Sequence, residues 1–313
     1  MNRTKASIWV LIAATFFGLV SLLVKIAYAV GMSAELVIGM QSIVGTSLLL
    51  VVGLQDWRNV VQVPHKTKLI LMFGGVISSL TSVFYYQSLS LLPASLAIIL
   101  LFQFTWIGVL LESLTKKQMP KWNQLLSVSV ILVGTIFSAD LSWTELREIS
   151  IAGILLGLGS AFTYSSMIFV SGNVANDLTV RAKTVWMTLG SFIMIMTFYP
   201  PIEAFQANDF TSTIWMWGLA IGICGVAIPY FMFNTAVRYV GSGLTSILGS
   251  LELPVVIICS AFVLHEDVTW IRWVGVFLIL IGVVIAEIKW KRKKPVSPIM
   301  QEEQIEKIRA NML

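Results

Sequence analysis

Charged residues are scarce in this chain. Lysine, arginine, aspartate and glutamate make up 12% of its 313 residues, against about 25% in an average soluble domain, while hydrophobic residue types make up 57%. No polar stretch is long enough for a catalytic ectodomain, a receptor head or a nucleotide-binding domain. A water-soluble fold cannot bury this much apolar surface, so the composition predicts an integral membrane protein.

Sequence motifs of enzymes are also missing. The chain has no zinc-binding H-E-x-x-H, no G-x-S-x-G nucleophile turn and no phosphate-binding G-x-x-x-x-G-K. His65 and His265 are the only histidines and fall in predicted loops, and the two cysteines, Cys224 and Cys259, fall inside apolar stretches, where cysteine acts as a small apolar residue. We therefore expect no enzyme activity, no cofactor, no metal site and no self-contained ATP-driven pump.

Ten mostly apolar stretches fill the chain. A helix needs about 20 residues to cross a hydrocarbon core of about 30 Å, and backbone groups in lipid must be hydrogen-bonded within the segment. We therefore predict an all-α polytopic membrane protein with ten transmembrane helices. The expected helices cover residues 7–30, 34–54, 69–91, 94–114, 122–139, 151–171, 183–200, 213–236, 243–264 and 270–289, the seventh being near the minimum length.

Lysines and arginines gather in one set of alternating segments between these helices. Eighteen of the 21 basic residues fall there, and the exceptions are Lys25, Arg147 and Arg272. Basic residues in short loops accumulate on the cytoplasmic side, so both termini are expected in the cytoplasm of a cell whose plasma membrane holds the protein. The net charge of +5 is then topological, and no nucleic-acid partner is expected.

Both ends of the chain allow a second interpretation. Arg3 and Lys5, followed by an apolar run and Ala27-Tyr28-Ala29, resemble a cleaved signal peptide, but the run is too long for one and carries Lys25. The basic run 289–294 is typical of an anchor that ends the last helix, and binding of anionic membrane lipid is the alternative. Residues 290–313 form a charged cytoplasmic tail in either interpretation.

A weak internal repeat divides the chain into two halves. An ungapped shift of 148 residues gives seven identities over the 46 pairs that start at residues 93 to 138, among them Trp122 with Trp270 and Gly134 with Gly282. Five helices per half is an odd number, so the second half must enter the membrane from the opposite side. Residues 1–140 and 151–289 are therefore expected to form an inverted repeat with a binding site between the halves.

Several segments resemble one family of transporters. They are Ala13 to Gly18 with Lys25; Tyr85-Tyr86-Gln87-Ser88 through Leu92-Pro93-Ala94 to Phe102-Gln103-Phe104-Thr105-Trp106; and Leu251-Glu252-Leu253-Pro254-Val255 ending in Leu264-His265-Glu266. Gly134 and Gly282 stand at the usual glycine of each half. On these segments the sequence is similar to a ten-helix member of the drug/metabolite transporter superfamily, of the EamA-domain type.

The resemblance covers nearly all of residues 6–288 and implies two EamA-like repeats of five helices and transport of small metabolites. The sequence departs from the family at Phe17, where tryptophan is usual, and at Met40-Gln41, where many relatives carry an arginine. The role of that arginine therefore does not transfer. The resemblance gives no substrate, since the family carries amino acids, sugars, nucleotide derivatives and drugs.

Two ionisable residues inside expected helices are candidates for the transport site, because a charge at bilayer depth costs about 2.5–3.5 kcal/mol even on insertion scales. Glu252 lies near the middle of its helix and is expected to carry a proton or to pair with a cationic substrate, or else to brace the broken helix as a hydrogen-bonded glutamate. Lys25 is close enough to its helix end to reach the interface, and pairing with a substrate carboxylate or with Glu252 is the alternative.

Uncharged polar residues complete the expected site. Tyr86, Gln103 and Trp106 are expected to shape an amphipathic cavity, with Tyr164 and Asn234 facing them from the other half. The serines near Tyr86, which include Ser78, Ser79 and Ser82, are assigned to helix packing.

Two prolines predict moving parts. Pro229 and Pro254 are expected to kink their helices and to act in gating, and tight packing of small residues is the alternative. We therefore predict a secondary-active exporter of small metabolites or drugs that works by alternating access and couples to protons if Glu252 titrates. A channel or a membrane sensor without transport is the main alternative.

Overall fold

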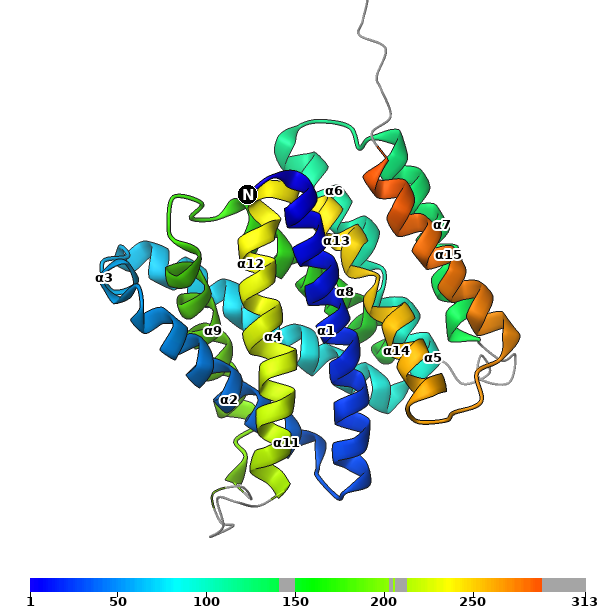
Figure 1. Cartoon of the computed structure of the whole chain (residues 1–313), viewed down its shortest axis with the longest axis horizontal. Coiled ribbons are helices and arrows are strands. Elements are labelled where there is room, and N and C mark those ends of the chain that lie inside the picture. The colour runs from blue at the N-terminus through cyan, green and yellow to red at the C-terminus, as the bar shows by residue number, and fades with distance from the viewer. Residues whose placement is uncertain (141–149, 203–204, 206–212, 289–313) are drawn as a thin grey trace, which may run out of the picture.

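The computed structural model describes residues 1–140, 150–202, 205 and 213–288. Arg147, the basic run 289–294 and the expected tail 290–313 lie outside these residues. The described part consists of helices and contains no strand (Figure 1). The helices are α1 Arg3–Ala29, α2 Ala34–Leu54, α3 Trp57–Val61, α4 His65–Leu91, α5 Ala94–Leu101, α6 Phe104–Lys116, α7 Trp122–Ala139, α8 Ile151–Asn173, α9 Val180–Phe198, α11 Thr213–Gly222, the π-helical turn η1 Ile223–Ala227, α12 Ile228–Val240, α13 Ser242–Gly249, α14 Glu252–Phe262 and α15 Trp270–Glu287.

Short polar residues fix where several of these helices begin. The Asn2 side chain accepts a hydrogen bond from the Lys5 backbone N–H at 2.9 Å, and Ser33, Ser150, Thr179 and Thr269 cap α2, α8, α9 and α15 in the same way. Each cap satisfies one of the backbone donors that a helix start leaves unpaired. The loops are therefore short and the helix starts well defined.

Nine helical segments of the described part are long and apolar enough to cross a membrane. They agree with nine of the ten expected helices, with α5 and α6, α11 to α12, and α13 and α14 each counted as one segment. The expected seventh helix corresponds to α9, which has 19 residues but falls outside this set. Arg181 and Lys183 in its first turns lower its mean hydropathy, so the count of ten is not confirmed.

Large apolar side chains cover the outside of the bundle. Leu69, Phe73, Leu155 and Phe277 are each about two-thirds exposed, between 64% and 67%. A soluble protein exposes such residues singly, whereas contiguous apolar surface marks contact with an apolar medium. The surface thus agrees with the composition, and the chain is a multi-pass membrane protein.

Helix boundaries recur at one spacing along the whole chain. α13 starts 148 positions after α5 (94 to 242), α15 starts 148 positions after α7 (122 to 270), and both pairs end at the same offset. The start of α8 follows that of α1 (3 to 151) and the start of α14 follows that of α6 (104 to 252) by 148. The sequence shift found over a short segment therefore extends to nearly every helix.

Contacts between counterparts show how the two sets of helices face each other. α7 packs along α15, and α2 packs along α9 (Figure 1). Lys25 of α1 contacts Ser260 near the end of α14, whereas its counterpart Asn173 of α8 contacts Ser242 at the start of α13. Equivalent residues thus meet opposite ends of the segment 242–262, which is the arrangement that an inverted repeat produces.

Candidate functional site

Two apolar helices are interrupted at equivalent positions. Residues 102–103 separate α5 from α6, and residues 250–251 separate α13 from α14. At both breaks the backbone makes short-range hydrogen bonds to the residue three positions earlier, from Gln103 N to Leu100 O and from Leu251 N to Leu248 O, each 3.2 Å. Such 3₁₀ turns inside a longer helix mark places where it can bend.

At the first break, the side chain of Gln103 is hydrogen-bonded within its own segment. Its amide nitrogen donates to the carbonyl of Ile99 at 2.9 Å, and its amide oxygen accepts from the Trp106 indole N–H at 2.8 Å. Both ends of the amide are thus occupied within the same segment. In this conformation Gln103 and Trp106 stabilise the break, and neither is among the residues that line the polar cavity described below.

A third irregularity is the π-helical turn η1 between α11 and α12. Pro229 is the second residue of α12, two positions after the end of η1. Proline has no N–H to donate and its ring clashes with the carbonyl four residues earlier, here that of Gly225, so the helix widens there. The helix is thus irregular beside Pro229, whose expected kink stays a prediction, and Pro254 stands in the first turn of α14, just after the second break.

Glu252 is the first residue of α14. Its side chain makes no hydrogen bond or ion pair within the described part of the chain, and it lies near enough to Tyr85 and Tyr164 to interact with them electrostatically. It stands directly after the second break, where the backbone N–H groups of Leu251 and Leu253 donate to Leu248 O and Ser250 O. This is the discontinuous-helix setting in which transporters place coupling residues.

A cavity of about 150 Å³ lies among α1, α2, α4, α8, α9, η1 and α12. The lining positions fall near the middle of their helices, so the cavity lies deep in the bundle. Eleven of its lining side chains are polar: Gln41, Ser42, Thr46, Ser78, Ser79, Thr81, Ser82, Tyr164, Thr188, Ser191 and Tyr230. Phe17, Ile38, Met167, Ile195 and Val226 supply the apolar side chains.

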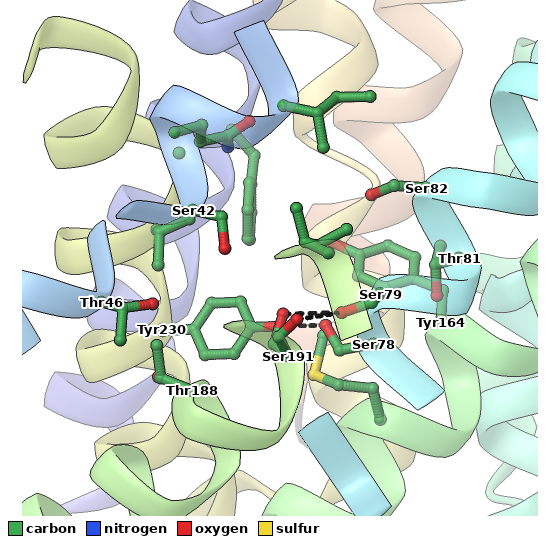
Figure 2. A pocket seen from close by; sticks show the side chains of 17 residues that line it. Ser42, Thr46, Ser78, Ser79, Thr81, Ser82, Tyr164, Thr188, Ser191 and Tyr230 are labelled. Carbon is green, nitrogen blue, oxygen red and sulfur yellow. Dashed lines mark hydrogen bonds between the residues drawn. The ribbon is translucent and has the colours of Figure 1, made fainter. Parts of the chain in front are cut away.

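A chain of hydroxyl groups crosses one side of this cavity (Figure 2). Ser79 and Ser191 share a hydrogen bond of 2.7 Å, and the Tyr230 hydroxyl is hydrogen-bonded to Ser78 and to Ser191. The four side chains come from α4, α9 and α12. Ser78 and Ser79, which were assigned to packing, therefore do join helices, and Ser78, Ser79 and Ser82 also face the cavity.

Of the remaining polar groups of the cavity, Thr81 is hydrogen-bonded to Thr163, and the other six have spare hydrogen-bonding capacity. Ser42, Thr46 and Thr188 are 8%, 4% and 2% exposed and make no side-chain hydrogen bond within the described residues, and the same holds for Gln41, Ser82 and Tyr164. Leaving a buried donor or acceptor unsatisfied costs about 1–3 kcal/mol. Such groups are the ones that a polar ligand would satisfy.

Of the residues expected at the site, the structure places only Tyr164 in this cavity. Tyr164 stacks edge-on against Phe104, with ring centroids 4.6 Å apart. Tyr86 shares a side-chain hydrogen bond with Tyr28 near the end of α1, and Asn234 is buried and accepts a hydrogen bond of 2.8 Å from Ser171. The expected cluster of Tyr86, Gln103, Trp106, Tyr164 and Asn234 is therefore not assembled in this conformation.

Lys25 pairs with Glu266, a loop residue that was not among those expected at the site. Its ammonium group is 2.8 Å from a carboxylate oxygen of Glu266, and Ser260 donates to the same carboxylate at 2.5 Å. The lysine thus lies at the bundle end, where its side chain is 49% exposed, and the pairing with Glu252 considered from the sequence is not formed. This ion pair joins α1 to the loop after α14.

Removing the Glu266 charge is expected to lower thermal stability at neutral pH and to have little effect in acid. The hydrogen bond from Lys25, and then that from Ser260, hold the pKa of Glu266 below its ordinary value. A lowered pKa contributes stability above the unfolded value of about 4.3, and this is lost as the pH falls through the lower folded value. Because both side chains are nearly half exposed, we expect no more than about 1 kcal/mol.

The measurement compares melting of wild type and Glu266→Gln at pH 7 and in steps below pH 4.5. Asp267→Asn is the matched control, since Asp267 is an exposed neighbour in the same loop. A difference between wild type and Glu266→Gln that persisted unchanged through the acid range would contradict this assignment.

Comparison with known proteins assigns the chain to a family. The model of the EamA-like transporter family matches residues 4–139 and 151–287. The chain belongs to the EamA-like transporter family. The two matched segments start at the second residue of α1 and the first residue of α8, and their ends, 139 and 287, are 148 positions apart, as the ends of α7 and α15 are.

The chain is also similar to two proteins that are named as transporters. The chain is 31% identical over 157 residues to the uncharacterized transporter YvbV of Bacillus subtilis (strain 168), an alignment that covers 47% of this chain and 48% of that protein. It is 36% identical over 66 residues to an uncharacterized transporter of Archaeoglobus fulgidus, covering 21% and 24%. The chain thus spans about half the length of the first relative and a quarter of the second.

A solved crystal structure of a protein superposes on 91% of this chain with a TM-score of 0.77, and the chain covers 97% of it. At 14% identity this likeness shows the fold alone. The fold of the described residues is therefore one already seen in a crystal.

Sequence reasoning missed most of the residues that line the cavity of this EamA-like transporter. Gln41 carried a signal, because an amide inside an apolar helix is expensive unless it is used. Ser191 and Thr188 carried none, since serine and threonine are common in membrane helices. Among the described residues there is also no group of three or more His, Cys, Asp or Glu side chains that could hold a metal ion.

Proposed function

We propose that this EamA-like transporter is a secondary-active carrier that exports small metabolites or drugs by alternating access. The observation that carries the proposal is the polar cavity in the middle of an apolar bundle. A cavity of about 150 Å³ accepts a solute the size of benzene, and unpaired polar groups on its wall give such a solute hydrogen-bonding partners. Export is the direction suggested by the resemblance to drug/metabolite transporters.

The proposal includes ten crossings arranged as two inverted repeats, residues 1–140 and 151–289. The Arg3 guanidinium lies 4.0 Å from the Glu287 carboxylate, so α1 begins at the bundle end where α15 finishes. An even number of crossings satisfies this contact, and α9 supplies the tenth. With both termini in the cytoplasm of a cell with this protein in its plasma membrane, Lys25 and Glu266 lie on the outer side.

The irregular segments supply the bending that alternating access requires. The two 3₁₀ breaks stand at equivalent positions of the two halves, and η1 adjoins the cavity through Val226. Transporters of this kind rock one repeat against the other about a central site. Pro229 and Pro254 are proposed as the residues that keep these segments from closing into regular helix.

Counterflow in proteoliposomes tests the proposal. Vesicles are loaded with an unlabelled solute from pools of amino acids, sugars or cationic drugs, and uptake of a labelled trace is followed with and without a pH gradient. A carrier gives a transient overshoot that saturates with solute. Linear flux without an overshoot would indicate a channel, and binding without any flux would indicate a sensor.

A further inference from the structure

The cavity has a chemistry that narrows the class of solute. We propose that it selects small uncharged solutes with several hydrogen-bonding groups, of the polyol or neutral amide class. This proposal rests on the proposed transport function, because it concerns the same cavity. It adds which property of a solute determines whether the cavity binds it.

The first observation is the absence of charge from the cavity wall. The described lining comprises ten hydroxyl side chains, one amide and six apolar residues, with no Lys, Arg, His, Asp or Glu among them. A charge that leaves water without meeting an opposite charge or a full set of hydrogen bonds is strongly disfavoured. A solute with a fixed charge would find no counter-ion on this wall.

The second observation is the position of the unpaired groups. Ser42 and Thr46 come from α2, and Thr188 comes from α9 on the wall below Tyr230; Ser82 and Tyr164 stand on the opposite side (Figure 2). These hydroxyls can both donate and accept, and the Gln41 amide adds two donors and an acceptor. A solute whose own groups alternate between donor and acceptor matches this wall, whereas a purely apolar solute leaves it unsatisfied.

The third observation is that some hydroxyl groups of the cavity are already hydrogen-bonded to one another and others are not. Ser78, Ser79, Ser191 and Tyr230 are already hydrogen-bonded to one another. They form a fixed wall of the cavity. Recognition is therefore assigned to Gln41, Ser42, Thr46, Ser82, Tyr164 and Thr188, whose side chains keep their capacity for a ligand.

Glu252 provides the main argument for a cationic solute instead of a neutral one. Its carboxyl group interacts electrostatically with Tyr164, which lines the cavity, but Glu252 itself is not part of the wall. If it reached the solute in another conformation, an amine would be preferred. The experiment therefore includes a cation of the same size.

The test measures equilibrium binding of labelled erythritol to the purified full chain in nanodiscs at pH 7. Glycolamide, ethanolamine and glycolate serve as competitors, because they are small solutes that are neutral, cationic and anionic. We expect glycolamide to compete at least tenfold better than the two ions. Absence of erythritol binding, or stronger competition by either ion, overturns the proposal.

Variants assign the recognition to the cavity wall. Thr188→Val and Thr46→Val each remove one hydroxyl at nearly constant shape, and each is expected to weaken erythritol binding two- to tenfold, the range of one neutral hydrogen bond. Thr197→Val is the matched control, since Thr197 is exposed on the same helix as Thr188 and bonds to Ile193 O. Equal affinities of Thr188→Val and Thr197→Val for erythritol would also overturn the proposal.

Counterflow distinguishes this proposal from the proposed function. Counterflow of ethanolamine or glycolate without that of erythritol would reject the neutral class and leave the carrier function intact. Erythritol binding at the wall without counterflow of any solute would reject the carrier function and leave the selectivity of the cavity standing.

Discussion

Replacing Glu252 with glutamine is expected to abolish transport driven by a pH gradient while counterflow remains measurable. Glutamine keeps the size of the side chain but cannot bind and release a proton. Glu252 starts α14 beside a break, makes no hydrogen bond or ion pair within the described residues, and adjoins Tyr164 of the cavity. Such a residue can change its proton occupancy as the helix moves without first breaking a partner contact.

The measurement is uptake of the counterflow substrate into proteoliposomes with an imposed pH gradient, for wild type and Glu252→Gln. Glu35→Gln is the control, because Glu35 is exposed at the start of α2 and is not among the residues that line the cavity. Unchanged pH-driven uptake by Glu252→Gln would show that the glutamate is structural. Loss of both uptake and counterflow would assign it to substrate binding instead of coupling.

Replacing Gly75 with alanine is expected to lower the stability of the fold by about 3 kcal/mol or more, near the upper end of the usual cost of overpacking. A Cβ atom at Gly75 of α4 would overlap the backbone carbonyl of Met187 and lie 2.8 Å from Ser191 N of α9. On the facing helix, Gly190 meets the backbone of Met72 in the same way. Backbone atoms cannot rotate aside, so the two helices would have to separate.

Gly249→Ala is the matched control for this prediction. A Cβ atom at Gly249 would meet only the ring of Phe104, at 3.5 Å, which is an ordinary contact. This variant is expected to be neutral or slightly stabilising, since alanine is favoured over glycine in a helix by about 1 kcal/mol. The measurement is the melting temperature of the detergent-solubilised full chain for Gly75→Ala and Gly249→Ala. Equal melting temperatures for the two variants would contradict the close approach of α4 and α9.

The close approach also matters for the cavity. Gly75 precedes Ser78 and Ser79 on α4 by about one turn, and Ser191 follows Gly190 on α9. The hydroxyl chain from Ser79 through Ser191 to Tyr230 therefore depends on the contact that these glycines allow. We expect that a substitution which separates the helices also disrupts this wall.

The membrane class, most of the helices, the spacing of 148 residues and the family could all be predicted from the order of the amino acids. These properties follow from local signals, namely apolar length, charge scarcity and a repeat that can be read along the chain. The irregular turn beside Pro229 has a local cause as well, because a missing N–H and a ring clash act within one turn. The break at residues 102–103 had no such mark, since no proline stands there.

The packing of the helices was needed to show which polar residues line the cavity and which are hydrogen-bonded to another side chain instead. Gln103 and Trp106 looked like ligand-binding residues but bond to each other, and Lys25 is bonded to Glu266, 241 positions away. Ser191 and Tyr230 gave no signal because their meeting requires α4, α9 and α12 to pack together. The physical reason is that a polar side chain in an apolar helix must find a partner, and the packing of distant helices determines whether that partner is another side chain or a solute.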